Sequence, residues 1–149
     1  MDREICFGTL LDNTEYRRRT GVYAVIIVGR EVATIRTSQG HCFLPGGGIE
    51  TEENHFDCLR REVIEELGYE VEISDYIGVA EQYFISTTNE PIFGIGHFYL
   101  CTLLDITQSI TEPEHQICWA NTQHVEELMF LEYQAWAVKQ ALKIGDGHF

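Results

Sequence analysis

The chain has few basic residues. It carries 10 Lys and Arg against 24 Asp and Glu, which gives a formal net charge of −14 over 149 residues. A protein that binds nucleic-acid polymers in general needs a basic surface to contact the phosphate backbone, so this composition argues against such a role. An anionic small molecule stays acceptable as a ligand, provided that metal ions lie between it and the carboxylates. We therefore expect a small-molecule ligand rather than a nucleic-acid polymer.

Long apolar runs and paired cysteines are also missing. No stretch of about 18 apolar residues occurs, so we expect no membrane span and no membrane partner. The first residues are charged and lack the apolar core of a signal peptide, which favours a cytoplasmic protein. The 5 cysteines form no C-x-x-C pair, so we expect free, mostly buried thiols rather than a zinc or redox site.

What remains is the composition of an ordinary globular chain, long enough for a single domain over residues 1–149. Apolar and β-branched runs predict strands at 21–28, 31–37, 42–44, 92–104 and 116–121, with one or two more within 69–86. Helical patterns predict helices at 54–67, 122–130 and 132–144, with Asn121 as an N-cap and Gly68 as a C-cap. Gly94 and Gly96 indicate a bulge or a close approach inside a strand. The order predicts a mixed α/β sandwich.

The segment 44–71, LPGGGIETEENHFDCLRREVIEELGYEV, holds an unusual concentration of acidic residues. The apolar positions of its helix are expected to face the core: Phe56, Leu59, Val63 and Leu67. Glu62, Glu65 and Glu66 fall on a neighbouring stripe, where like charges repel by a few tenths of a kcal/mol per pair. Either this stripe is a well-solvated surface, or a cation binds there.

The acidic residues of this segment differ in how well local structure explains them. Those at the start of the helix (Glu50, Glu52 and Glu53) are favoured by the helix dipole, whereas the later stripe is not. Mg²⁺, which takes oxygen ligands, would compensate the stripe. Arg61 can orient a carboxylate through a bidentate bond, and glycines 46–48 allow a tight turn close to an ion or phosphate.

These residues resemble the Nudix box, in which Gly, five residues, Glu and seven residues precede Arg-Glu-U-x-Glu-Glu-x-Gly-U, with U a bulky apolar residue. The matching positions here are Gly47, Glu53, Arg61-Glu62-Val63, Glu65-Glu66 and Gly68-Tyr69. Two departures are Tyr69, at a position that is usually aliphatic, and Glu52, where many members carry Gly. The resemblance implies a Nudix-type α/β/α sandwich with a mixed sheet flanked by helices.

The resemblance also implies a hydrolase that cleaves a nucleoside diphosphate linked to another group, with Mg²⁺ or Mn²⁺ as cofactor. It places Glu62, Glu65 and Glu66 as metal ligands, with the carbonyl of Gly46 as a further one. Glu53 or Glu62 would be the catalytic base or its assistant, and Arg61 would orient a catalytic glutamate. A carboxylate from a distant loop often helps in this family, and Glu112 or Glu114 would supply it here, although loop solubility explains these two equally well.

Substrate choice lies outside the box. ADP-ribose hydrolases of the family tend to carry a proline about fifteen residues beyond it, where this chain has Phe84, and Tyr83 is out of register for the tyrosine of dinucleoside polyphosphate hydrolases. The short single domain favours a MutT-like enzyme that converts a (deoxy)nucleoside triphosphate to monophosphate and pyrophosphate. ADP-ribose or dinucleoside polyphosphate hydrolysis and a non-catalytic nucleotide sensor are the alternatives. The intact glutamate set favours the enzyme over the sensor.

Other features have two interpretations each. Arg17, Arg18 and Arg19 form either a solvated surface or a phosphate-binding group. The aromatic residues Tyr23, Tyr83, Phe84, Phe93, Phe98 and Trp119 would stack a base, but such residues in strands more often belong to the core. His97 and His115 are better explained as structural histidines.

The apolar face of the last helix fits either burial within one chain or a homodimer. No twelve-residue loop of alternating Asp and Asn occurs, which argues against a calcium-binding protein.

Overall fold

The structure is a computed structural model, and it describes residues 5–106 and 116–144. Its strands are β1 (Cys6–Phe7), β2 (Arg17–Val28), β3 (Glu31–Arg36), β4 (Cys42–Phe43), β5 (Gly46–Gly48), β6 (Tyr69–Ile85), β7 (Pro91–Ile106) and β8 (Gln116–Asn121). Its helices are α1 (His55–Leu67), the 3-10 turn η1 (Thr122–His124), α2 (Val125–Leu128) and α3 (Glu132–Ile144).

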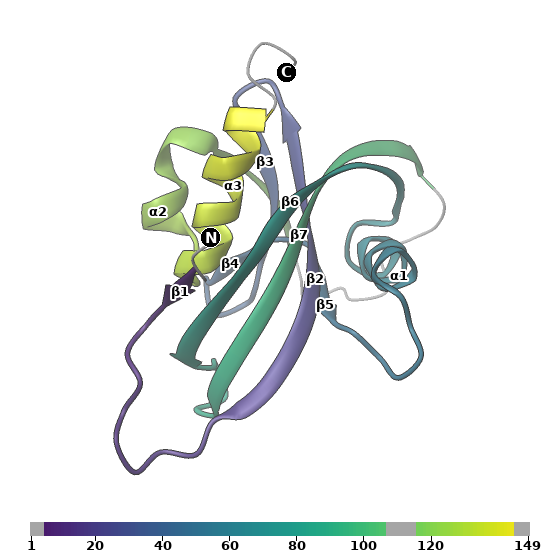
Figure 1. Ribbon diagram of the computed structural model, residues 1–149. Helices are drawn as coiled ribbons and strands as arrows, with labels where there is room; N and C mark the ends of the chain where they lie inside the picture. The colour runs from purple at the N-terminus through teal and green to yellow at the C-terminus, as the bar shows by residue number, and fades with distance from the viewer. Residues whose placement is uncertain (1–4, 107–115, 145–149) are drawn as a thin grey trace.

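The strands form one mixed sheet in the order β1-β6-β7-β2-β3-β4, with β5 paired to β2 and β8 paired to β3. Strands β2 and β7 run parallel through ten paired positions, from Arg17–Ile92 to Ile26–Cys101. Helix α1 covers one face of the sheet, and α2 and α3 cover the other (Figure 1). The expected α/β/α sandwich with a mixed sheet is confirmed.

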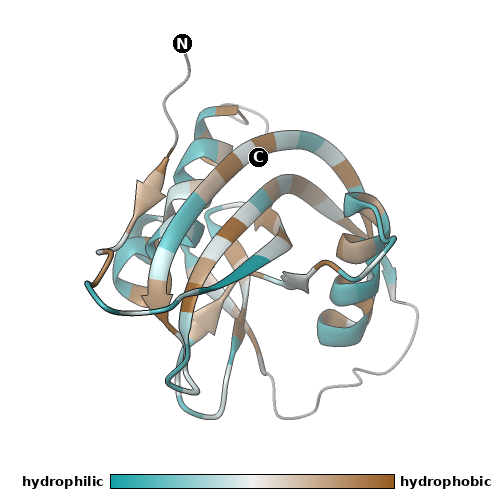
Figure 2. Ribbon diagram, turned by 60° about the horizontal axis from the view of Figure 1, so that its bottom comes forward, coloured by the Kyte–Doolittle hydropathy of each residue, from teal (hydrophilic) through white to brown (hydrophobic). Residues whose placement is uncertain are grey.

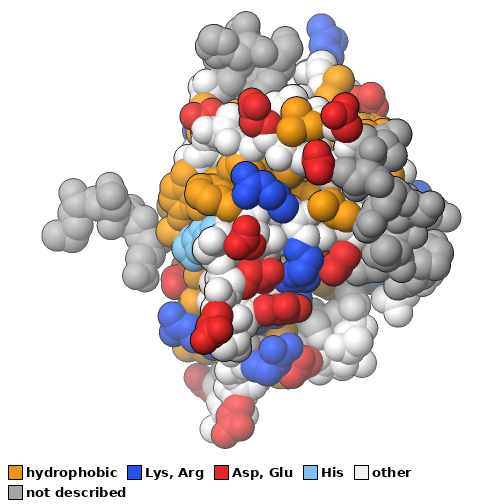
Figure 3. Space-filling view, turned by 90° about the vertical axis from the view of Figure 1, so that its right-hand side faces the viewer, with side chains coloured by type: hydrophobic (Ala, Val, Ile, Leu, Met, Phe, Trp, Pro, Cys, Tyr) orange, Lys and Arg blue, Asp and Glu red, His pale blue; other side chains and the backbone are white. Residues whose placement is uncertain are grey.

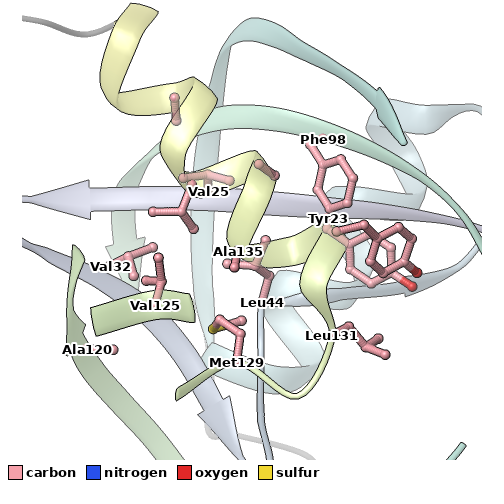
Figure 4. Close-up of a cluster of buried hydrophobic side chains, with 14 of the residues drawn as sticks. Tyr23, Val25, Val32, Leu44, Phe98, Ala120, Val125, Met129, Leu131 and Ala135 are labelled. Atoms are coloured by element: carbon pink, nitrogen blue, oxygen red, sulfur yellow. The ribbon is translucent and has the colours of Figure 1, made fainter. Parts of the chain in front are cut away.

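Strand β2 supplies side chains to both layers, because successive residues of a strand point to opposite faces. Val22, Ala24 and Ile26 pack with α1, in a cluster that includes Leu59. Tyr23 and Val25 pack on the opposite face against residues of α2 and α3, together with Leu44, Phe98 and Leu131 (Figure 4). The central strand therefore holds both helical layers, and it reaches β5 at the point where the glycine turn begins.

Helix α1 begins and ends as expected. The Asn54 side chain accepts a hydrogen bond from the Asp57 N–H at 2.8 Å, and Gly68 closes the helix in the left-handed conformation, with φ 74°. The expected core face is wrong at one residue, because Phe56 is 47% exposed whereas Cys58 is fully buried. The Phe56 ring lies 5.6 Å from the Tyr99 ring between centroids, and the Arg60 guanidinium lies over it at 6.0 Å. Figure 2 shows hydrophobic and hydrophilic residues alternating along α1.

Several boundaries differ from those expected. Of the one or two strands expected within 69–86, the structure has one, β6 (Tyr69–Ile85), with register shifts at 69–71, 73–75 and 76–78. The helix expected at 122–130 is a 3-10 turn followed by one α-helical turn that ends at Leu128, although Asn121 does cap it through the Gln123 N–H. A Cβ on Gly94 would lie 2.9 Å from the Tyr133 hydroxyl, so this glycine marks a close approach rather than a bulge.

Two composition-based expectations can be compared with the described residues. All 5 cysteines are free, and Cys42, Cys58 and Cys101 among them are buried. Across residues 5–106 and 116–144, no helix is both long and apolar enough to cross a membrane.

Candidate active site

The glycine turn brings the end of the sheet against helix α1. Gly46, Gly47 and Gly48 pair with Tyr23, Val22 and Gly21 of β2. Gly46 has φ 142°, a conformation that residues with a side chain rarely adopt. A Cβ on Gly47 would lie 2.6 Å from Glu62 Oε1, so only glycine leaves room for that carboxylate. The turn therefore sets the distance between the backbone and the acidic stripe of α1.

Arg61 lies at the centre of this acidic cluster. Its Nε and Nη2 donate to the two oxygens of Glu53, at 2.8 and 3.0 Å. Its Nη1 donates to Glu62 Oε1 at 2.9 Å and lies 3.6 Å from Glu65 Oε2 and 3.8 Å from Glu50 Oε1. One guanidinium thus faces four carboxylates. Arg61, which is expected to orient a catalytic glutamate, donates two hydrogen bonds to Glu53 and one to Glu62.

The electrostatic consequence is clearest at Glu53. Its hydrogen bonds from Arg61, with that of the Glu50 N–H, lower the pKa of this carboxyl to about 2. The pKa of Arg61 is raised, mainly by the hydrogen bond to Glu53. Both groups stay charged at neutral pH, and the pair holds the loop before α1 against the middle of the helix.

Glu66 lies apart from the Arg61 contacts, on the side of the helix that faces the sheet. Its side chain is buried, with 8% exposed, and its Oε1 accepts a hydrogen bond from the Gly46 N–H at 2.8 Å. The link between Gly46 and the acidic stripe therefore runs through the Gly46 amide. A metal-binding role for the Gly46 carbonyl stays a prediction.

The donor atoms of the cluster fit a hard divalent cation. Carboxylate oxygens from Glu62, Glu65 and Glu66 are the ligand type that Mg²⁺ prefers. Arg61 supplies a single positive charge beside four carboxylates, which leaves an excess of negative charge. In the described part of the chain, no three His, Cys, Asp or Glu side chains already stand in metal-holding geometry. The type of donor atom fits Mg²⁺, while Arg61 contacts the side chains of Glu62 and Glu65 and the Gly46 N–H binds that of Glu66.

Figure 3 shows the face of the molecule that carries α1, where acidic and basic side chains lie interspersed. This arrangement agrees with the ion pairs of Arg61, because each acidic side chain around it lies within 4 Å of the same guanidinium. Glu62 and Glu65 of the acidic stripe therefore belong to an ion-paired cluster around Arg61 rather than to a merely solvated surface.

A cavity of about 230 Å³ lies beside the cluster, on the side of the sheet that α3 covers. Gly46, Gly47 and Glu66 form the wall that it shares with the acidic site. The rest of its lining comes from distant parts of the chain, including Arg19, Thr37, Phe43, Phe84, Ser86, Phe130, Tyr133 and Gln134. Aromatic rings and a few polar groups in one concave space are typical of a small-molecule site.

The three arginines of β2 do not share one role. Arg17 forms a bidentate ion pair with Glu90, at 2.8 and 2.9 Å. Arg18 lies over the Phe93 ring at 6.0 Å. Arg19 lines the cavity next to Gly48, and it has no carboxylate partner within 4.0 Å in the described residues. Only this arginine is placed to meet an anionic ligand.

The structure also sorts the aromatic and loop candidates. Tyr23 and Phe84 line the cavity, whereas Phe98 is core and Tyr83 packs on Phe93 at 4.5 Å. Trp119 is 37% exposed on β8, away from the cavity lining. His97 accepts or donates a hydrogen bond with the Tyr76 hydroxyl at 3.1 Å and lies on His55, consistent with a structural role. Glu112, Glu114 and His115 lie outside the described residues.

Sequence reasoning missed Phe43, Phe130 and Gln134 as lining residues. Phe43 and Phe130 lie 5.3 Å apart and come from β4 and from the connection between α2 and α3. Gln134 carried one available signal, since it is a polar residue between Tyr133 and Ala135 on the side of α3 that proves to be buried.

The comparisons with known proteins agree with this geometry. The sequence model of the NUDIX domain matches residues 8–145. The chain belongs to the NUDIX domain family. It is thus a Nudix hydrolase, an enzyme that acts on phosphoric anhydride bonds. Members of this family generally use divalent metal cations and act on small-molecule nucleotides.

Solved structures share the Nudix fold at low sequence identity. A NUDIX hydrolase from Nitrosomonas europaea has a TM-score of 0.70 at 13% identity, covering 84% of this chain and 88% of its own. A MutT NUDIX hydrolase from Burkholderia pseudomallei has a TM-score of 0.68 at 21% identity, covering 83% and 98%. An ADP-ribose pyrophosphatase from Streptococcus suis has a TM-score of 0.65 at 20% identity, covering 88% and 94%. No curated protein matches the sequence.

Proposed function

We propose that this Nudix hydrolase is a Mg²⁺-dependent pyrophosphohydrolase of nucleoside triphosphates, releasing a nucleoside monophosphate and pyrophosphate. The observation that carries the proposal is the common wall of the two sites. Gly46, Gly47 and Glu66 border both the Arg61-centred acidic cluster and a cavity lined by aromatic rings. A nucleotide whose base occupies the cavity would therefore place its phosphates at the carboxylates.

The size of the cavity supports a substrate with one base. Its volume of about 230 Å³ is below the range of about 300–1,000 Å³ that is usual for drug-sized ligands. It suits one ring system, and the cluster beside it suits the phosphates. This argument favours a nucleoside triphosphate over a dinucleoside polyphosphate, whose second base would lie outside the cavity.

Each residue of the cluster has its own part in the proposed reaction. Bound Mg²⁺, held by Glu62, Glu65 and Glu66, would neutralise charge on the phosphate oxygens. Arg19, in the lining of the cavity next to Gly48, would bind a phosphate oxygen. Water attacks phosphorus, the phosphoric anhydride bond breaks, and pyrophosphate leaves.

The contacts of Glu53 help to assign the base. Both of its oxygens accept hydrogen bonds from Arg61, and Oε1 also accepts one from the Glu50 N–H at 3.0 Å. We therefore assign Glu53 as the residue that positions Arg61, and Glu62 as the group that takes the proton from water. Arg61 orients Glu62 through the bond to its Oε1.

The test is a substrate panel with Mg²⁺ and, as control, with EDTA. The four nucleoside triphosphates, ADP-ribose and a dinucleoside tetraphosphate are incubated with the enzyme, and monophosphate, pyrophosphate and phosphate are quantified by chromatography. We expect pyrophosphate from triphosphates, abolished by EDTA. Preferential cleavage of ADP-ribose or of the dinucleotide would overturn the substrate assignment, and a flat result across the panel would favour a nucleotide sensor.

A further inference from the structure

Gln134 is a polar residue in an unusual setting. It is the third residue of α3, its side chain is 1% exposed, and it lines the cavity. Its Oε1 accepts a hydrogen bond from the Leu44 N–H at 2.7 Å. Because a backbone N–H can only donate, the atom that faces Leu44 must be the oxygen, and this fixes which end of the amide carries the nitrogen.

The nitrogen end of this amide has two hydrogens to donate. Within residues 5–106 and 116–144, no hydrogen bond involves Gln134 Nε2. Buried polar groups are almost always hydrogen-bonded, because leaving one unpaired costs its desolvation. A buried donor at the wall of a cavity therefore points to a ligand acceptor.

We propose that Gln134 selects the base of the nucleotide by donating both hydrogens of Nε2 to O6 and N7 of a 6-oxopurine. This inference rests on the proposed function, because it takes the cavity to hold the base. Glutamine pairs with adenine by using its oxygen and its nitrogen together, whereas O6 and N7 of guanine require donors alone. The bond from Leu44 occupies Oε1, so Gln134 offers donors alone, and adenine's exocyclic amino group would meet a second donor.

The other groups around the cavity suit a flat ring. Phe43, Phe84 and Phe130 supply apolar faces, and stacking on aromatic rings does not discriminate between bases. Discrimination between bases therefore depends on the polar side chains of the lining. Among the neutral ones, Gln134 is the most deeply buried.

The chain supplies a matched control in Gln82. This side chain is also buried, at 5% exposed, and its Oε1 accepts a hydrogen bond from the Tyr133 N–H at 2.9 Å. Gln82 does not line the cavity. The same substitution at both positions therefore separates an effect on ligand selection from the effect of altering a buried amide.

The first measurement uses the unaltered enzyme. We expect kcat/KM for dGTP and dITP to exceed that for dATP by about 10- to 100-fold, the range of one good bidentate pair. dITP lacks the 2-amino group, so its equality with dGTP assigns the contact to O6 and N7. 7-Deaza-dGTP, which lacks the N7 acceptor, should lose about tenfold. Equal kcat/KM values for dGTP and dATP, or no loss with 7-deaza-dGTP, would overturn the proposal.

The second measurement compares Gln134→Glu, Gln134→Met and Gln82→Glu. Gln134→Glu keeps an acceptor for the Leu44 N–H but removes the two donors, so the dGTP/dATP ratio of kcat/KM should fall at least tenfold. Gln134→Met should also lose the discrimination, and Gln82→Glu should keep it. If Gln134 had only a structural role, its substitution would lower kcat/KM for dGTP and for dATP by the same factor and leave their ratio unchanged. If a Gln134 variant fails to unfold cooperatively on heating, the analogue panel on the unaltered enzyme decides.

A binding experiment separates this inference from the proposed function. GMP and AMP are titrated calorimetrically into the unaltered enzyme without Mg²⁺. GMP binding at least tenfold tighter, with no hydrolysis of any triphosphate, would support the selection by Gln134 and refute the pyrophosphohydrolase. Hydrolysis of all triphosphates with equal kcat/KM, together with equal binding of GMP and AMP, would support the pyrophosphohydrolase and refute the selection by Gln134.

Discussion

The acidic cluster and the cavity meet at Gly46, Gly47 and Glu66, yet the chain builds them in different ways. The cluster comes from one contiguous segment, residues 46–68, in which a glycine turn and a helix place Arg61 among its carboxylates. The cavity takes residues from β2, β3, β4, β6, β7 and α3. Under the proposed function, the groups for phosphate chemistry come from one short segment, whereas the groups that would select the substrate come from many parts of the fold.

If the cluster serves every substrate equally, its loss should affect all of them alike. Glu65→Gln and Glu66→Gln should each lower kcat/KM for every nucleotide by at least about a hundredfold, because each removes a negatively charged oxygen ligand. The fold should stay intact or become more stable, since repulsion is relieved. Steady-state kinetics and thermal unfolding measure the two effects.

The matched control is Glu70→Gln, which removes an exposed carboxylate just beyond the end of α1. It should leave kcat/KM unchanged. Full activity in both Glu65→Gln and Glu66→Gln would show that the metal assignment is wrong.

The second-largest effect on catalysis should come from the hydrogen-bond geometry of Arg61 rather than from its charge alone. Arg61→Lys keeps the positive charge but cannot hold Glu53 in a bidentate bond and Glu62 at the same time. We expect a loss of about 10- to 100-fold in kcat, equal for all nucleotides. Kinetics on dGTP and dATP would check it, and a loss confined to one of them would break the division between cluster and cavity.

The cavity should respond in the opposite way. Phe130→Leu keeps an apolar side chain beside Phe43 but removes a ring on which a base can stack. Base stacking contributes about 1–3 kcal/mol, so we expect KM to rise about tenfold with kcat little changed. A fall in kcat without a change in KM would contradict the assignment of Phe130 to binding.

His97, which lies outside the acidic cluster and the cavity lining, should affect the stability of the fold without affecting activity. Burial of the imidazole lowers the pKa of His97, and the charge of the neighbouring His55 lowers it further by a smaller amount. The unfolded chain therefore takes up a proton at higher pH than the folded protein, and stability should fall as pH drops below about 6.5. Thermal unfolding between pH 8 and pH 5.5 should show this loss, and it should be smaller in His97→Gln. An equal loss in both proteins would place its origin elsewhere.

The smallest expected effect concerns the loop before α1. Glu52 has φ 67°, in the left-handed region that favours glycine. Glu52→Gly should therefore stabilise the protein by up to about 1 kcal/mol, because glycine relieves this strain, with kcat/KM unchanged. Denaturant unfolding would measure the gain. A destabilised variant would indicate that the greater freedom of glycine in the unfolded chain outweighs the relief of strain.

The segment that forms the cluster could be predicted because its signals are local. The caps at Asn54 and Gly68 and the spacing of Glu62, Glu65 and Glu66 depend only on helix geometry. Even here, helical periodicity predicts a core position for Phe56, which is 47% exposed, because periodicity does not show which residues of a helix the sheet covers. Glu66 is buried for a reason that periodicity also misses, the bond from the Gly46 N–H.

The chain's sequence alone determined its family, its fold class and the residues proposed for phosphate chemistry, because these follow from a short pattern of glycines, carboxylates and one arginine. Only the tertiary structure decided which arginine of β2 lines the cavity and which end of the Gln134 amide is occupied by the Leu44 N–H. The reason is that a hydrogen bond between Leu44 and Gln134 joins residues 90 positions apart, and no local pattern encodes it.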